Sequence, residues 1–304
     1  MSTPTPPIPP TPPDLRARRV RWRHWYVESV TTLALVVAGG GTLLLLTGHG
    51  PGVLLGAAPW VCAVLAVVSS TVVVPRRAAL ADVLWVAPAV AGAVAALASG
   101  AVPALVGATG VAALVAYQRV FTRQHQPAGP LAVGSPLPDV PLSRLDGSAV
   151  STAQLRGTPL LLLFVRGSWC PFCVAQVRDL AAEYRELDRR GVRVIVVSPQ
   201  RAEDTADLAA RFEVPMDFLV DAGGEAMRAL DLVQVGGMPA LFSEAGETDT
   251  VVPTVVLVGA DGTVRWLHHA ADHRVRPGAP ELVAAVDRML GLDREGRDGA
   301  EAPG

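Results

Sequence analysis

The sequence GSWCPFC, at residues 167–173, holds two of the three cysteines of this 304-residue chain, Cys170 and Cys173. An apolar run at 160–165 precedes it and predicts a buried strand, and apolar residues at helical spacing over 170–190 predict a helix. A cysteine at such a junction lies at a helix N-terminus, where unpaired N–H groups and the helix dipole favour the thiolate. The pair is therefore typical of thiol–disulfide exchange.

The two cysteines are expected to have different roles. Cys170 is predicted to be the attacking sulfur because it begins the helix and is the more exposed, and Cys173 is predicted to resolve the mixed disulfide, which gives a redox-active Cys170–Cys173 disulfide. The flanking Trp169 and Pro171 argue against two cysteines that only pack in a core. Trp169 is either a platform beside the sulfur or an apolar cover on the sheet. Arg166 either lowers the thiolate pKa by its charge or lies at the surface.

No metal or cofactor is predicted. The third cysteine, Cys62, lies in an apolar segment, and no second C-x-x-C supplies the ligands of a tetrahedral zinc site. His268, His269 and His273 are the other potential ligands. Adjacent histidines on a strand point to opposite faces, so solvated surface histidines are the preferred interpretation.

Composition divides the chain into an apolar first half and a second half typical of an α/β domain. The net charge of −2 and the absence of basic residues interleaved with aromatic ones in the second half argue against a nucleic-acid partner. Residues 1–26 are Pro-rich and then Arg-rich and are expected to be a disordered tail.

Residues 27–123 predict a transmembrane helical domain that contacts the lipid bilayer. About four spans are expected, at 30–46, 53–74, 79–99 and 101–120. Gly100 and Pro103 supply the break between the last two spans, and a tight hairpin is the interpretation there. If those two spans were one kinked helix, the C-terminal domain would lie on the opposite side of the membrane.

The second half begins with a linker at 124–137, continues as a domain at 138–291 and ends in a disordered tail at 292–304. Strands are predicted at 139–142, 148–150, 160–165, 192–197, 218–220, 254–258 and 264–267, and helices at 151–155, 170–190, 202–212 and 279–290. Residues 231–250 are expected to be an inserted loop.

This order of elements resembles the thioredoxin fold. The resemblance rests on residues 169–173 and on Val252, Pro253 and Thr254. The lead-in at 134–139 and the closing segment at 272–276 look like the redoxin branch, AhpC/TSA or peroxiredoxin-like, and the resemblance covers about residues 134–291. It implies an α/β fold with a central mixed sheet flanked by helices.

The resemblance also implies that Pro253 is a cis-proline packed against the C-x-x-C. A proline there would leave the Val252 backbone free to bind an extended substrate, with Thr254 next on the strand. A strand-edge proline is the alternative.

The chain departs from both branches at defined positions. The position of the thioredoxin acid is Phe164, so the proton must go elsewhere or to water. The Pro and the Thr or Ser of peroxiredoxins are replaced by Leu163 and Gly167, which weakens the case for strict peroxidase chemistry.

Three functions follow. The first is a membrane-anchored thiol–disulfide oxidoreductase that acts on a protein or small-molecule disulfide and takes electrons from a separate donor. The second is a peroxiredoxin-like thiol peroxidase with Cys170 peroxidatic and Cys173 resolving. The third is a membrane redox sensor or scaffold without enzymatic activity.

The arginines predict the side of the membrane. The N-terminal cluster, Arg76 with Arg77, and Arg119 with Arg123 fall on one side of four spans, so the redox domain is expected to face the cytoplasm. Membrane-tethered members of the thioredoxin-like group often act on the outer side, and that alternative stays open.

Overall fold

The computed structural model of the chain describes residues 58, 60–61, 78–98, 100–116, 118–119, 122–124, 126–238 and 248–292. The expected tail at 1–26, the expected span at 30–46 and nearly all of the expected span at 53–74 lie outside these residues. So does the expected C-terminal tail beyond residue 292.

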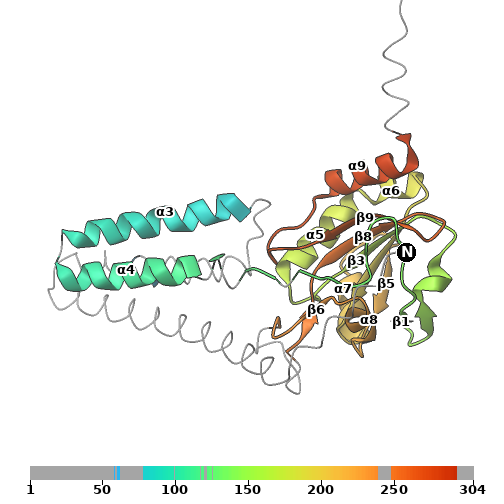
Figure 1. Cartoon of the computed structure of the whole chain (residues 1–304), viewed down its shortest axis with the longest axis horizontal. Helices are drawn as coiled ribbons and strands as arrows, with labels where there is room; N and C mark the ends of the chain where they lie inside the picture. The colour runs from blue at the N-terminus through green and yellow to red at the C-terminus, as the bar shows by residue number, and fades with distance from the viewer. Residues whose placement is uncertain are drawn as a thin grey trace, which may run out of the picture.

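A seven-stranded sheet forms the centre of the C-terminal half, with the strand order β2-β1-β5-β4-β3-β8-β9 (Figure 1). The strands are β1 (Pro141–Arg144), β2 (Ala149–Ser151), β3 (Leu160–Phe164), β4 (Arg193–Ser198), β5 (Asp217–Val220), β8 (Thr254–Val258) and β9 (Val264–His269). β3 and β4 pair in parallel, as do β4 and β5, whereas the other neighbours are antiparallel. This mixed sheet confirms the predicted α/β thioredoxin-like architecture.

Helices cover the sheet. They are the 3-10 helix η2 (Thr152–Leu155), α5 (Pro171–Ala182), α6 (Tyr184–Arg189), α7 (Ala202–Ala209), α8 (Glu225–Ala229) and α9 (Ala279–Leu290). Alternate residues of β3 point to opposite faces: Leu161 and Leu163 share one core cluster with α5, α6, α7 and α9, and Leu160 and Leu162 share the other with η2 and α8. All four of these leucines are completely buried.

The helix predicted over 170–190 is interrupted. Glu183 leaves the helical conformation, with φ −98° and ψ 8°, and separates α5 from α6. Tyr184 and Leu187 pack on the same core cluster as α5. The apolar spacing is therefore the same before and after Glu183, and for this reason it did not predict the break. Gly191, at φ 66°, ends this helical region as expected.

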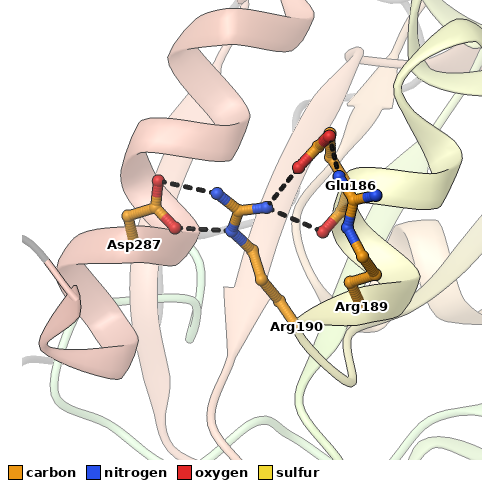
Figure 2. Close-up of polar contacts among 4 residues, drawn as sticks. All are labelled: Glu186, Arg189, Arg190 and Asp287. Carbon is orange, nitrogen blue, oxygen red and sulfur yellow. Dashed lines mark hydrogen bonds and ion pairs between the residues drawn. The ribbon is translucent and has the colours of Figure 1, made fainter.

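An ion-pair group joins α6 to α9. Arg190 donates from Nε to Asp287 Oδ1 at 2.5 Å and from Nη1 to Glu186 Oε2 at 2.9 Å, and Glu186 also pairs with Arg189 (Figure 2). The bond to Asp287, and then that to Glu186, raises the pKa of Arg190. The group fixes the closing helix against the helices that follow the cysteines.

The expected inserted loop at 231–250 contains structure of its own. A second sheet of two short strands, β6 (Val233–Gln234) and β7 (Thr250–Val251), joins its two ends. β7 leads directly to Val252 and Pro253 and then into β8, so this small sheet lies beside the start of a central strand.

Two apolar helices precede this domain. α3 (Ala78–Leu97) and α4 (Ala101–Ala116) lie side by side, with Ala89 and Leu114 buried between them (Figure 1). Gly100, at φ 117°, makes the turn and confirms the predicted break between the third and fourth apolar segments. Within the described ranges, no helix combines the length and the apolar character needed to cross a membrane.

The chain contacts the C-terminal domain soon after α4. Gln124 N–H donates to Ala271 O at 2.9 Å and His273 N–H donates to Thr122 O at 3.0 Å, so residues 122–124 lie antiparallel to the loop at 271–273. Further on, Gly134 and Ser135 exchange backbone hydrogen bonds with Val264 of β9. Both ends of the expected linker are thus bonded to the domain.

Replacing Leu162 with alanine is expected to lower the free energy of unfolding by about 2–5 kcal/mol, because the side chain is completely buried in the central strand and its loss leaves a cavity. Val133→Ala is the control, since that side chain is 64% exposed and its truncation should cost less than about 0.5 kcal/mol. Urea unfolding of the full chain, followed by circular dichroism, measures both. Equal losses for the two variants would contradict the core assignment.

Candidate active site

The two cysteines lie at the carboxyl end of β3, where the chain turns into α5. Cys170 is the N-cap residue, Pro171 occupies the first turn, and Cys173 follows within that turn. Both cysteines are free thiols. Cys170 is only 1% exposed and Cys173 is fully covered, so the expectation of an exposed Cys170 is wrong. The reason is that both side chains belong to the same core cluster.

The two thiols interact, so that the pKa of each depends on the other. The hydrogen bond to Cys173 and burial raise the pKa of Cys170 well above its usual value. Burial alone would raise the pKa of Cys173 too, but the bond from Cys170, the charge of Arg276 and the Arg166 N–H together lower it to about 5. The positive charges of Arg166 and Arg276 therefore favour a thiolate within the cysteine pair.

Arg166 is buried beside the pair, with 6% of its surface exposed. Its backbone N–H donates to Cys173 Sγ at 3.4 Å, its side chain bonds to Cys170, and its Nη2 donates to Gly237 O. Its guanidinium carbon lies 4.9 Å from the centre of the Trp169 ring. Arg166 is therefore buried next to the cysteines and is not at the surface, and Trp169 contacts this cation and also packs on the core cluster.

Arg276 was not singled out from the sequence, although its segment was. It follows β9, and its Nη2 lies 4.0 Å from Cys173 Sγ. Its Nη1 donates to Val275 O at 2.9 Å and weakly to Asp272 O at 3.5 Å. The Nε atoms of Arg276 and Arg166 are both buried and have no hydrogen-bond partner within the described part of the chain. Two guanidinium groups thus lie beside the cysteine pair.

Gln200 is a second residue that the sequence did not reveal. It follows β4, and its Oε1 accepts a hydrogen bond from the Ser168 N–H in the loop before Cys170. Gly167, at φ 133°, lies against this side chain, and a Cβ at that position would overlap it. The available signal was a polar residue just after a parallel strand next to β3, where the carboxyl ends of the strands meet.

The expected cis-proline is wrong. The peptide bonds of the described residues are all trans, that between Val252 and Pro253 included. The Val252 backbone is also occupied: its N–H donates to Leu232 O at 2.6 Å, and its carbonyl accepts from Thr254 Oγ1 at 3.0 Å. The backbone groups of Val252 that were expected to bind substrate are therefore already hydrogen-bonded within the protein.

Pro253 nevertheless lies at the expected end of the sheet. Thr254 pairs with Phe164 at the start of β8, so Pro253 faces the residues just before the cysteines. Thr250 Oγ1 donates to Arg166 O at 3.4 Å from the same side. The expected site residues 166–173 and 252–254 therefore lie at the same end of the sheet. Residues 252–254 are buried and support residues 166–173.

The three histidines are half-buried and have separate surroundings, so the expectation of solvated histidines is wrong. His268 stacks on Trp266, and the Nδ1 of His269 lies 2.9 Å from Thr254 Oγ1. The ring of His273 meets Phe172 edge-on at 5.7 Å, and its Nδ1 lies 3.1 Å from Thr122 O. Burial, and then the charge of Arg166, lower the pKa of His273 well below its usual value.

Comparison with known proteins gives consistent results. Residues 133–267 match the AhpC/TSA family. The chain is 26% identical over 100 residues to chloroplastic peroxiredoxin Q of Oryza sativa subsp. japonica, which covers 33% of this chain and 46% of that protein. It is 30% identical over 130 residues to the thiol-disulfide oxidoreductase ResA of Oceanobacillus iheyensis, and this match covers 40% of this chain and 64% of ResA. It thus spans about half to two thirds of these relatives.

Solved structures are similar at lower identity. Reduced Prx3 from Vibrio vulnificus has a TM-score of 0.45 and 20% identity, covering 52% of this chain and 99% of that one. Peroxidoxin BcpB from Mycobacterium tuberculosis has a TM-score of 0.43 and 17% identity, covering 52% and 98%. The mixed sheet, the cysteines at the end of β3 and the family match together show that the second half of the chain is a thioredoxin-fold redoxin domain that matches the AhpC/TSA family over residues 133–267.

Proposed function

We propose that the redoxin domain is a thiol–disulfide oxidoreductase that alternates between the Cys170, Cys173 dithiol and the Cys170–Cys173 disulfide. The observation that carries the proposal is a pair of free thiols at the start of α5, with Arg276 Nη2 4.0 Å from Cys173 Sγ and the Arg166 side chain buried nearby. Positive charge beside the sulfurs favours the thiolate, which is the nucleophile of disulfide exchange. ResA, a relative of this chain, is named for the same chemistry.

The reaction has two steps. The Cys170 sulfur attacks one sulfur of the substrate disulfide, so a mixed disulfide forms, the substrate S–S bond breaks, and one thiol leaves with a proton. Cys173 then attacks Cys170, which forms the intramolecular disulfide and releases the second thiol. The protein loses two electrons and two protons, which the substrate gains. A separate thiol donor reverses these steps and restores the dithiol.

A thiol peroxidase is the second candidate, favoured by the positive charge of Arg166 and Arg276 beside the sulfurs and by the peroxiredoxin relatives. There the Cys170 sulfur would attack a peroxide oxygen, the O–O bond would break, and water or an alcohol would leave. Cys173 would then attack the sulfenic acid and release water. Leu163 and Gly167 occupy the positions where that family carries its Pro and its hydroxyl, which favours disulfide exchange.

The chain is further proposed to be anchored in the cell membrane by its apolar N-terminal region, with the redoxin domain in the cytoplasm. Support comes from apolar side chains that face outward from α3 and α4, namely Val90, Val94, Leu97, Val102 and Leu105. Side chains of this kind gain free energy in contact with lipid. The distribution of arginines supports the orientation.

Cys170→Ser is expected to abolish reduction of a small disulfide such as bis(2-hydroxyethyl) disulfide by the reduced full chain. Serine keeps the size of the side chain and cannot form the mixed disulfide. Cys62→Ser is the matched control and should keep the parent rate. Mass spectrometry of acid-quenched samples detects the mixed disulfide. Undiminished exchange in the Cys170 variant would refute the role of this sulfur, and an unchanged cellular phenotype would favour a sensor or scaffold.

Stopped-flow oxidation of the reduced chain by hydrogen peroxide separates the first two functions. For a disulfide exchanger, we expect a second-order rate constant no greater than that of free cysteine at the same pH. A rate several orders of magnitude higher that disappears in Cys170→Ser would establish the peroxidase instead.

Sidedness is best tested at an exposed position, because both redox cysteines are covered. With Cys62, Cys170 and Cys173 replaced by serine, Val133→Cys should resist a membrane-impermeant maleimide in intact cells and react after lysis. Alkaline carbonate extraction should leave the chain in the membrane pellet. Labelling in intact cells would place the domain outside, and extraction into the supernatant would contradict the anchor.

A further inference from the structure

A tight turn carries the chain from the end of β3 to Cys170. Cys170 N–H donates to Gly167 O at 3.2 Å, which closes a four-residue turn with Ser168 and Trp169 at its centre. Gly167 has φ 133°, a conformation that is readily available to glycine alone. The position of Cys170 therefore depends on the contacts that hold the first two residues of this turn.

Gln200 meets the turn from the neighbouring strand. β3 and β4 are parallel, with Phe164 opposite Val197, and Val165 N–H donates to Val197 O at 2.9 Å just beyond the end of β3. Three residues further along both chains, the same register places Gln200 opposite Gly167. The contact agrees with the register, because a Cβ on Gly167 would overlap the Gln200 side chain from Cγ to Oε1.

The main chain that carries Gln200 is itself held on both sides. Gln200 N–H donates to Ser198 Oγ at 3.2 Å, and Ser198 is completely buried at the end of β4. On the other side, Arg201 is the N-cap residue of α7, and its carbonyl accepts from Thr205 N–H at 3.1 Å and from Thr205 Oγ1 at 3.0 Å. A side chain carried between a buried strand and a helix start has a well-defined position.

The structure assigns Gln200 as a positioning residue for Cys170. Its Oε1 accepts from Ser168 N–H, and its side chain occupies the space that the absent Cβ of Gly167 leaves open. The effect reaches Cys170 through the turn hydrogen bond to Gly167 O. Gln200 thus acts through the main chain of the turn. The assignment deepens the thiol–disulfide function proposed above and rests on it.

Exchange at Cys170 is sensitive to the position of its sulfur. The residue is only 1% exposed, so a substrate sulfur has few directions of approach. A misplacement of about 1 Å at a reacting group costs up to about a hundredfold in rate. Because glycine has wide conformational freedom, a turn that begins at Gly167 needs an outside contact to select one conformation. The hydrogen bond from Ser168 to Gln200 is such a contact.

Variants of Gln200 test the assignment through the rate of mixed-disulfide formation. Gln200→Leu keeps the approximate size of the side chain and removes the acceptor, whereas Gln200→Glu keeps an oxygen for Ser168 N–H. With the reduced full chain and bis(2-hydroxyethyl) disulfide, the rate should fall by about tenfold to a hundredfold in Gln200→Leu, and Gln200→Glu should recover most of the loss. Each variant is compared at the pH of its fastest reaction, which removes the effect of the added carboxylate on thiol ionisation.

The matched control is Gln154→Leu. Gln154 makes the same kind of contact at η2, where its Oε1 accepts from Ser151 N–H at 2.8 Å, and its rate should equal that of the parent. Far-UV circular dichroism verifies that each variant is folded. If Gln200→Leu is unfolded, Gln200→Asn takes its place, because its oxygen lies one bond short of Ser168.

Hydrogen exchange at the Ser168 amide measures the contact without any turnover. Mass spectrometry of the full chain should show exchange at least about tenfold faster in Gln200→Leu and close to the parent in Gln200→Glu. An unchanged amide or an unchanged mixed-disulfide rate in folded Gln200→Leu would overturn the assignment. A faster rate would overturn it too, because the contact would then restrain Cys170 instead of positioning it. Loss of amide protection in a chain whose parent exchanges no disulfide would count against the proposed function alone.

Discussion

The position of β3 is the constraint on which the redox site depends. This strand is paired on both edges, with β4 in parallel and with β8 antiparallel, and its side chains are buried on both faces. A strand held in this way fixes where its chain leaves the sheet, and therefore where α5 begins and where the two sulfurs lie. The antiparallel register with β8 then brings Pro253 to the same edge.

The charge at that edge is permanent. Both basic groups beside the sulfurs are arginines, and a guanidinium stays protonated in proteins even when burial lowers its pKa, as it does for Arg166. A lysine in either place could lose its proton and with it the stabilisation of the thiolate. Each guanidinium is also held by main-chain carbonyls, Gly237 O for Arg166 and Val275 O for Arg276, which orient the group and leave its charge for the sulfurs.

Local sequence patterns predicted most of the fold. The continuous apolar run of β3, the C-x-x-C and the helical spacing after it are properties of neighbouring residues, and the structure has a strand, a cysteine pair and a helix there. The break at Glu183 was missed because the buried pattern continues through Tyr184 and Leu187.

The errors at the site arise from contacts between distant segments. Whether Cys170 is exposed depends on Arg166, Trp169 and the core cluster around them, and the occupied Val252 backbone depends on Leu232. The roles of Gln200 and Arg276 depend on how loops after β4 and β9 meet the start of α5. Neither the periodicity nor the motifs of a single sequence predict contacts between such distant segments. The cysteine pair could be predicted because its two residues lie close together in the sequence.

The hydrogen bonds of residues 122–124 have a consequence for how the domain meets other molecules. They begin shortly after α4 ends at Ala116, and they attach the chain to the loop that leads to Arg276. A segment hydrogen-bonded in this way restricts the loop at 271–273 and thereby the position from which Arg276 approaches the cysteines. The entropy of ordering that loop is consequently lost once, during folding, and is not lost again at each encounter.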